Sequence, residues 1–327
     1  MCVAGDGQAT GALPFAGLAA SVQHMSSIRI IGVPMDLGAS RRGVDMGPFA
    51  VRYTDLRERL EKLGHAVEDA GNVPVPFRED AERGAQRGAR YLGAITDVCR
   101  TVAQQSRDAL ADGRLPLVLG GDHSMAAGSV AGAAAHFAAR GERIGLIWID
   151  AHGDLNTPGS SNSGNVHGMP LAHLLGHGDS ALANVAGVRP AVQAEHVALV
   201  GVRDLDAPER EHIAKWKLKA LTMRALDERG VRAVMEEAVA VAGAGTAGIW
   251  VSLDMDVVSP ETAPGVGTAV AGGMTLRESH LAMEMLADTG KVVGIDLAEV
   301  NPVLDERNHT ASVATDLLLS ALGKRIL

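Results

Sequence analysis

The 327-residue sequence contains few cysteines and few aromatic residues. Its two cysteines, Cys2 and Cys99, cannot build a disulfide framework, so a reducing cytoplasm is the expected compartment. Aromatic residues make up only 3% of the chain, whereas Gly occurs 39 times. We therefore expect a core of Val, Ile, Leu and Ala, joined by many tight backbone turns.

The sequence also lacks basic tracts and long apolar runs. The stretch AVAVAGAGTAGIWVSL, uncharged and near the middle of the chain, is broken by Gly and shorter than the roughly 18–20 residues of a membrane span. A net charge of −9 without a basic tract argues against nucleic acid as a partner. It is compatible with a cationic small molecule, although net charge mainly affects solubility.

The first 25 residues are rich in Gly and Ala and lack the basic start of a signal peptide. We expect residues 1–25 to be a disordered extension, or Met25 to be the true start. Residues 26–327 are then expected to form one catalytic domain, because no linker and no internal repeat divides them.

Short apolar runs alternate with longer segments of helical period. The expected strands are residues 28–34, 65–71, 115–121, 143–152, 196–204, 219–223, 248–256 and 291–300. Several are nearly continuous in Val, Ile and Leu, which is typical of strands buried on both faces. The expected helices are 80–113, 124–141, 208–217, 226–242 and 275–290. This alternation predicts an α/β fold with a mostly parallel, roughly eight-stranded sheet between helices.

Acidic and imidazole side chains follow five of the predicted strands, in the sequences GGDHS, DAHGDLN, RDLD, DMD and DLAEVNP. Ligands of open parallel sheets bind at the carboxyl ends of the strands. If the sheet prediction is right, these side chains converge on one edge. By contrast, GAGTAG at 243–248 follows a predicted helix and enters a strand, so we interpret it as a loose connection and not as a dinucleotide motif.

The converging side chains suit a pair of metal ions. Those that could be ligands are His123, Asp150, His152, Asp154, Asp254 and Asp256. Clustered carboxylates raise one another's pKa unless cations neutralise them, and four negative charges match two divalent ions. Asp150 and Asp254 would bridge two cations that share a water. Oxygen-rich ligation favours Mn²⁺ over Zn²⁺. A single Asp-x-His sequence is more often part of a turn than of a metal site. In GGDHS, we expect Asp122 and Ser124 to cap the following helix and only His123 to bind metal.

The motifs GGDHS, DAHGDLNTP, SGNVHGMP, SLDMD and EVNP, in this order, resemble those of the ureohydrolase superfamily and, within it, the arginases. The resemblance extends from about residue 28 to the C-terminus. It implies a three-layer α/β/α fold, two Mn²⁺ per subunit, and hydrolysis of L-arginine to L-ornithine and urea by a metal-bridging hydroxide. One ion would bind His123, Asp150, Asp154 and Asp254, and the other Asp150, His152, Asp254 and Asp256. It also implies a homotrimer or homohexamer.

The resemblance further implies roles in proton transfer and in guanidinium binding. Asp154 would carry the proton to the departing amine, and His167 would be a general acid/base that exchanges protons with solvent. Glu299 would pair with the substrate guanidinium. For His167 the alternative is a loop histidine with a structural hydrogen bond, and for Glu299 a solvated loop charge.

Five further positions match the substrate-binding residues of arginases. Asn156, Ser163 and Asn165 would contact the α-carboxylate, and Asp206 the α-amino group. Thr268 is a weaker match near the guanidinium. Ordinary turn chemistry is the alternative for the Asn and Ser residues. The sequences DLN and SGN favour arginine over agmatine.

Two other functions are compatible with the sequence. The nearest is agmatinase or another guanidine ureohydrolase. The other is a non-catalytic protein that binds a metal and a ligand, against which stands the complete set of expected ligands and proton-transfer residues.

Overall fold

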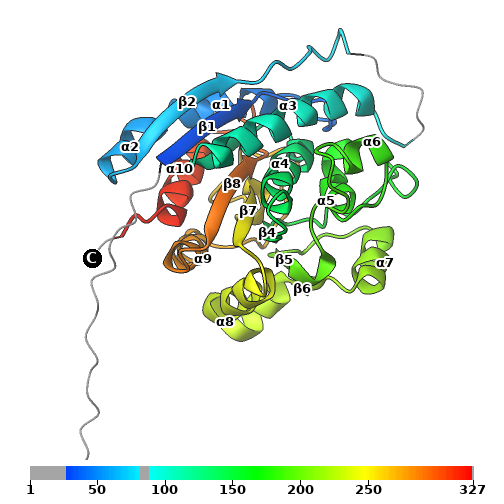
Figure 1. The fold of residues 1–327 in the computed structure, drawn as a ribbon. Helices are drawn as coiled ribbons and strands as arrows, with labels where there is room; N and C mark the ends of the chain where they lie inside the picture. Colours follow the sequence, from blue (N-terminus) through cyan, green and yellow to red (C-terminus); the bar gives the residue numbers. More distant parts are fainter. Residues whose placement is uncertain (1–26, 82–87, 326–327) are drawn as a thin grey trace, which may run out of the picture.

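The computed structural model describes residues 27–81 and 88–325, and its centre is one sheet of eight parallel strands (Figure 1). The strand order is β2-β1-β3-β8-β7-β4-β5-β6. Each strand overlaps one of the eight predicted runs, which confirms the sheet. The expected extension 1–25 lies outside the described residues. The strands are β1 Ser27–Val33, β2 Ala66–Asn72, β3 Leu115–Gly120, β4 Ile144–Ile149, β5 Val197–Val200, β6 Lys219–Leu221, β7 Gly248–Asp254 and β8 Val292–Ala298.

Helices cover both faces of the sheet and complete the three layers (Figure 1). Successive side chains of a strand point to opposite faces, so Ile147 and Ile149 join one core cluster whereas Leu146 and Trp148 join the other. One cluster packs with α1, α2, α8, α9 and α10, and the other with α3, α4, α5 and α6. The helices are α1 Gly47–Arg52, α2 Leu56–Lys62, α3 Leu92–Ala111, α4 Ala126–Ala138, α5 Pro170–Leu174, α6 Ser180–Ala183, α7 Ala207–Trp216, α8 Met223–Gly243, α9 Leu276–Asp288 and α10 His309–Ala321.

The helices were predicted less completely than the strands. The expected helix 80–113 was wrong at its start, because α3 begins at Leu92. Gly88 has φ 87°, and a Cβ there would lie 2.0 Å from the carbonyl oxygen of Pro158. Gly88 therefore lies outside the helix and contacts the loop that contains Pro158. Five further helices, α1, α2, α5, α6 and α10, were not predicted from the sequence. In the described part of the chain, no helix is long and apolar enough to cross a membrane.

The topology brings the chemically active motifs together. The strands β3, β8, β7 and β4 are consecutive in the sheet, and their carboxyl ends carry GGDHS, EVNP, DMD and DAHGD respectively. The GAGTAG segment joins the end of α8 to the start of β7, as expected for a simple connection.

Candidate metal centre

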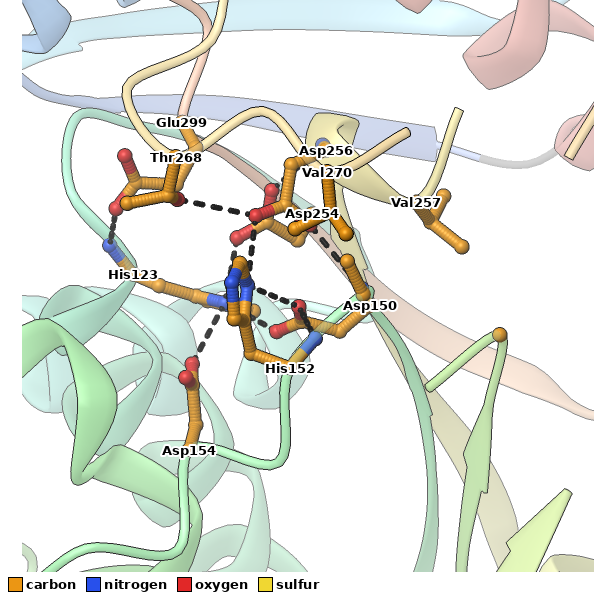
Figure 2. A network of polar contacts seen from close by, with 12 residues as sticks. His123, Asp150, His152, Asp154, Asp254, Asp256, Val257, Thr268, Val270 and Glu299 are labelled. Carbon is orange, nitrogen blue, oxygen red and sulfur yellow. Dashed lines mark hydrogen bonds and ion pairs between the residues drawn. The ribbon is translucent and has the colours of Figure 1, made fainter. Parts of the chain in front are cut away.

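The predicted ligands lie at the carboxyl ends of β3, β4 and β7, and short turns direct their side chains toward one another (Figure 2). Asp150 Oδ1 accepts a hydrogen bond of 2.6 Å from the backbone N–H of His152. Asp254 Oδ1 accepts one of 2.8 Å from the backbone N–H of Asp256. Asp side chains often bond their own backbone two residues on. Each turn folds the chain so that the next potential ligand faces the same site.

The first cluster forms around His123. Its Nδ1 atom lies 3.2 Å from Asp150 Oδ2, and 3.1 Å from one oxygen each of Asp154 and Asp254. His123 is only 1% exposed, yet Nδ1 has no hydrogen-bond partner among the described residues. A buried nitrogen that faces three carboxylates without a well-oriented hydrogen bond fits a bound cation.

The second cluster shares Asp150 with the first. His152 Nδ1 lies 2.9 Å from Asp256 Oδ2 and 3.5 Å from Asp150 Oδ1. Among the residues that the structure describes, two sets have metal-compatible spacing: His123, Asp150 and Asp254, and Asp150, His152 and Asp256. One oxygen of Asp150 faces each set, which is the arrangement that a bridging carboxylate requires.

A chain of buried hydrogen bonds fixes the orientation of the His123 ring. Its Nε2 lies 2.8 Å from Ser252 Oγ, and Ser252 Oγ donates to Asp296 Oδ1 at 2.5 Å. Because the hydroxyl proton goes to Asp296, Ser252 accepts from the Nε2–H of His123. In the neutral ring the Nδ1 atom then carries the lone pair, which is the tautomer that can bind a metal.

The charges of the cluster also fit divalent cations. Burial, and then the neighbouring Asp150, raise the pKa of Asp154 to about 7. Burial, Asp256 and Asp150 raise the pKa of Asp254 well above its usual value. For His123, burial alone would lower the pKa, but the surrounding carboxylates, Asp150 first, raise it. Without cations the cluster retains protons, and two divalent ions would replace them.

His167 and Glu299 lie beside this cluster. His167 Nδ1 is 2.9 Å from Glu299 Oε1, which also accepts a 3.0 Å bond from the backbone N–H of His123. Burial would lower the pKa of His167, but Glu299 raises it to about 9. The other oxygen of the buried Glu299, Oε2, has no partner in the described part of the chain. Both Asp154 (φ 50°) and Glu299 (φ 65°) have left-handed backbone conformations, which carry strain and cluster at functional sites.

A polar cavity of about 140 Å³ opens above the cluster. The predicted substrate residues Asn156, Ser163, Asn165, Asp206 and Thr268 all line it, together with His152, Asp154 and His167. Asn156 Nδ2 donates to Asp206 Oδ2 at 3.0 Å, and Thr268 Oγ1 donates to Asp256 Oδ2 at 3.1 Å. The structure thus brings every sequence-predicted site residue to one place.

Four residues support the site in roles that the sequence did not indicate: Glu209, and three that lie inside quoted motifs, Ser252 in SLDMD, Asp296 in DLAEVNP and Arg203 in RDLD. Glu209 accepts bonds from the backbone N–H groups of Leu155 (3.1 Å) and Asp206 (2.9 Å), and so ties two sides of the cavity together. Its capping-box spacing from Asp206 could have revealed it. Arg203 donates to the backbone carbonyls of Asp256 and Val270 at 2.6 and 2.7 Å, and no motif signals this role. Asp122 caps the short turn His123–Met125 through the N–H of Ser124, which confirms its capping role, whereas the prediction for Ser124 was wrong, because α4 begins after Met125 without a side-chain cap.

The fold and the site together define an α/β protein with paired carboxylate–imidazole clusters suited to two metal ions. Residues 26–323 match the family model described as the arginase family, and the chain belongs to that family.

The comparisons with individual proteins cover nearly the whole chain. The arginase of Bacillus caldovelox is 49% identical over 93% of this chain and 100% of its own. That of Bacillus subtilis is 46% identical over 92% and 99%. The crystal structure of the Bacillus caldovelox arginase superposes with a TM-score of 0.89, covering 93% and 100% of the two chains. The Entamoeba histolytica arginase in complex with L-ornithine is similar with a TM-score of 0.84 at 28% identity, over 92% and 99%.

Proposed function

We propose that this protein hydrolyses L-arginine to L-ornithine and urea at a binuclear manganese centre. The observation that carries the proposal is that two metal-compatible clusters share Asp150 beneath a polar cavity. The curated arginases at 46–49% identity support the reaction. The L-ornithine complex of the Entamoeba histolytica arginase supports the substrate class.

The residues that would hold the metals are those of the two clusters. One ion would bind His123, Asp150, Asp154 and Asp254, and the other Asp150, His152, Asp254 and Asp256. When bound, the two ions would supply the positive charge that lowers the pKa of a water from its bulk value to roughly 7. Carboxylate oxygens outnumber the imidazole nitrogens, which favours Mn²⁺.

The protein's own side chains would bind the guanidinium and move protons. Glu299 Oε2 is buried and has an open acceptor position in the described structure, which suits a guanidinium N–H. Asp154 lines the cavity and would pass a proton to the departing amine. His167, whose side chain is 15% exposed, would exchange protons between solvent and the cavity.

Polar residues that line the cavity would select arginine over agmatine. Asn156, Ser163 and Asn165 supply neutral polar groups for the α-carboxylate, and Asp206 a carboxylate for the α-amino group. Agmatine lacks the carboxylate, so it would leave these donors unpaired, which disfavours its binding.

A steady-state urea assay of the manganese-loaded protein tests the proposal, with metal analysis in parallel. L-Arginine is expected to give a higher kcat/KM than agmatine or other guanidines. A higher kcat/KM for agmatine would overturn the substrate assignment. If none of the guanidines released urea, the non-catalytic alternative would be favoured. We further propose a homotrimer or homohexamer in the cytoplasm; light scattering of the purified protein would measure the subunit number.

A further inference from the structure

We propose that Arg90 is a positioning residue that turns the side-chain amide of Asn165 so that its N–H groups face the carboxylate end of the substrate. The inference rests on the proposed function, and it adds a residue outside the motifs already assigned. Arg90 is half-buried and lies just before α3, in the chain segment that follows Gly88.

The side chains of Arg90, Ser40 and Asn165 contact one another beside the cavity. The Arg90 guanidinium donates through Nη2 to Asn165 Oδ1 and, at 2.9 Å, to Ser40 Oγ. Ser40 Oγ in turn donates to the same Asn165 oxygen at 3.0 Å. Asn165 also lines the cavity, whereas Arg90 and Ser40 approach it from the side of two other loops.

These contacts determine which end of the amide is presented to a ligand. A guanidinium can only donate hydrogen bonds, so the Asn165 atom facing it must be the oxygen. With Oδ1 held by Arg90 and Ser40, the Nδ2 group is left for the cavity. Two N–H donors match a carboxylate, whereas a carbonyl oxygen in that position would repel it.

The backbone supports the same arrangement. Arg90 N–H donates to the carbonyl oxygen of Gly164 at 2.8 Å, one residue before Asn165. Gly88 lies against the Pro158 carbonyl so closely that a Cβ would come within 2.0 Å. Residues 88–90 therefore contact the loop that contains Pro158, Gly164 and Asn165. The positive charge of Arg90 lies beside the proposed position of the substrate carboxylate.

The test compares ligands that differ only in the carboxylate. L-Ornithine carries it, and 1,4-diaminobutane is the same molecule without it. Arg90→Met keeps the aliphatic stem but removes the donors and the charge. We expect the KM of L-arginine and the Ki of L-ornithine to rise about tenfold, about 1.4 kcal/mol. The Ki of 1,4-diaminobutane and kcat are expected to stay within about twofold of wild type.

Arg100→Met is the matched control, because Arg100 lies on the surface of α3 and pairs with Asp97 at 2.5 Å, away from the cavity. Equal rises in both Ki values, or no rise in either, would overturn the inference. If Arg90→Met does not fold, Ser40→Ala removes the second donor to Asn165. It is then expected to raise the Ki of L-ornithine alone about two- to threefold, and an unchanged Ki would contradict the inference. Absence of urea release by the wild type would instead refute the proposed function, while L-ornithine binding measured by calorimetry would still test Arg90.

Discussion

His167 Nδ1 lies 2.9 Å from Glu299 Oε1, so the expected proton-exchange residue and the expected guanidinium-binding carboxylate are in direct contact. Neither residue belongs to the two metal-compatible sets. His167→Ala should therefore lower kcat by about 10²-fold, the lower end of general acid–base contributions, and leave the metals bound. Urea-release kinetics with metal analysis of the same sample would measure both.

His309→Ala is a suitable control, because His309 is exposed at the start of α10. It should leave kcat unchanged. A His167→Ala protein that loses its metals would instead make His167 a ligand or a structural residue.

Asp150 belongs to both metal-compatible sets, whereas Asp256 belongs to one. Asp150→Asn should weaken binding of both manganese ions, because each set loses a charged oxygen. Asp256→Asn should weaken one. Asp254→Asn should also affect both ions if it bridges as the family resemblance implies. Calorimetric titration of the metal-free proteins would count the sites; two ions bound by the Asp150 variant with wild-type affinity would contradict the bridging role.

The sheet and the metal ligands could be predicted because their signals are local. A run such as IGLIWI is buried on both faces, and the Asp and His residues directly after it must lie at the carboxyl edge. The hydrogen bonds that position these ligands could not be predicted in the same way. Ser252 and Asp296 are polar residues inside two buried strands, and they meet only because β7 and β8 pair with Ser252 opposite Asp296.

Helices and long-range contacts gave weaker signals. The buried α10 segment is largely apolar and lacks the polar stripe that identifies an amphipathic helix. Arg90 and Asn165 are 75 residues apart, and no spacing rule links them. Such contacts depend on how loops fold over the sheet edge.

Asp296 is expected to control metal affinity through His123. It is fully buried and accepts bonds from Ser252 Oγ (2.5 Å), Ser129 Oγ (2.6 Å) and Trp250 Nε1 (2.6 Å). Asp296→Asn replaces one carboxylate oxygen by an NH2 group, which would face the O–H and N–H groups that now donate to Asp296. The Ser252 hydroxyl then loses the acceptor that fixes its orientation. Mn²⁺ affinity should fall about 10- to 100-fold, as is typical when an outer partner of a ligand is changed. Calorimetry of the metal-free protein measures this directly.

Ser129→Ala is the matched control, because it removes a donor to Asp296 that is not in contact with His123. It should change Mn²⁺ affinity by less than about threefold. Equal losses in both variants would mean that Asp296 acts through general packing and not through His123.

Metal affinity should increase with pH. Burial and Asp150 raise the pKa of Asp154 to about 7, and burial, Asp256 and Asp150 raise that of Asp254 well above its usual value. A raised pKa means that the metal-free protein still holds protons near neutral pH, and these must leave before the oxygens bind a cation. Mn²⁺ affinity should therefore rise as the pH increases from about 6 to about 8. Calorimetry in buffers with different ionisation enthalpies would count the released protons.

Asp154→Asn provides the control for this linkage, because the amide has no proton to release. The variant should release fewer protons on Mn²⁺ binding and show a shallower dependence of affinity on pH than the wild type. Wild-type affinity that does not change with pH, with no proton release, would show that the cluster is already deprotonated before the metals bind. The carboxylates around His123 would then need another source of compensating charge, and protonation of Asp154 and Asp254 would not be what the metal ions displace.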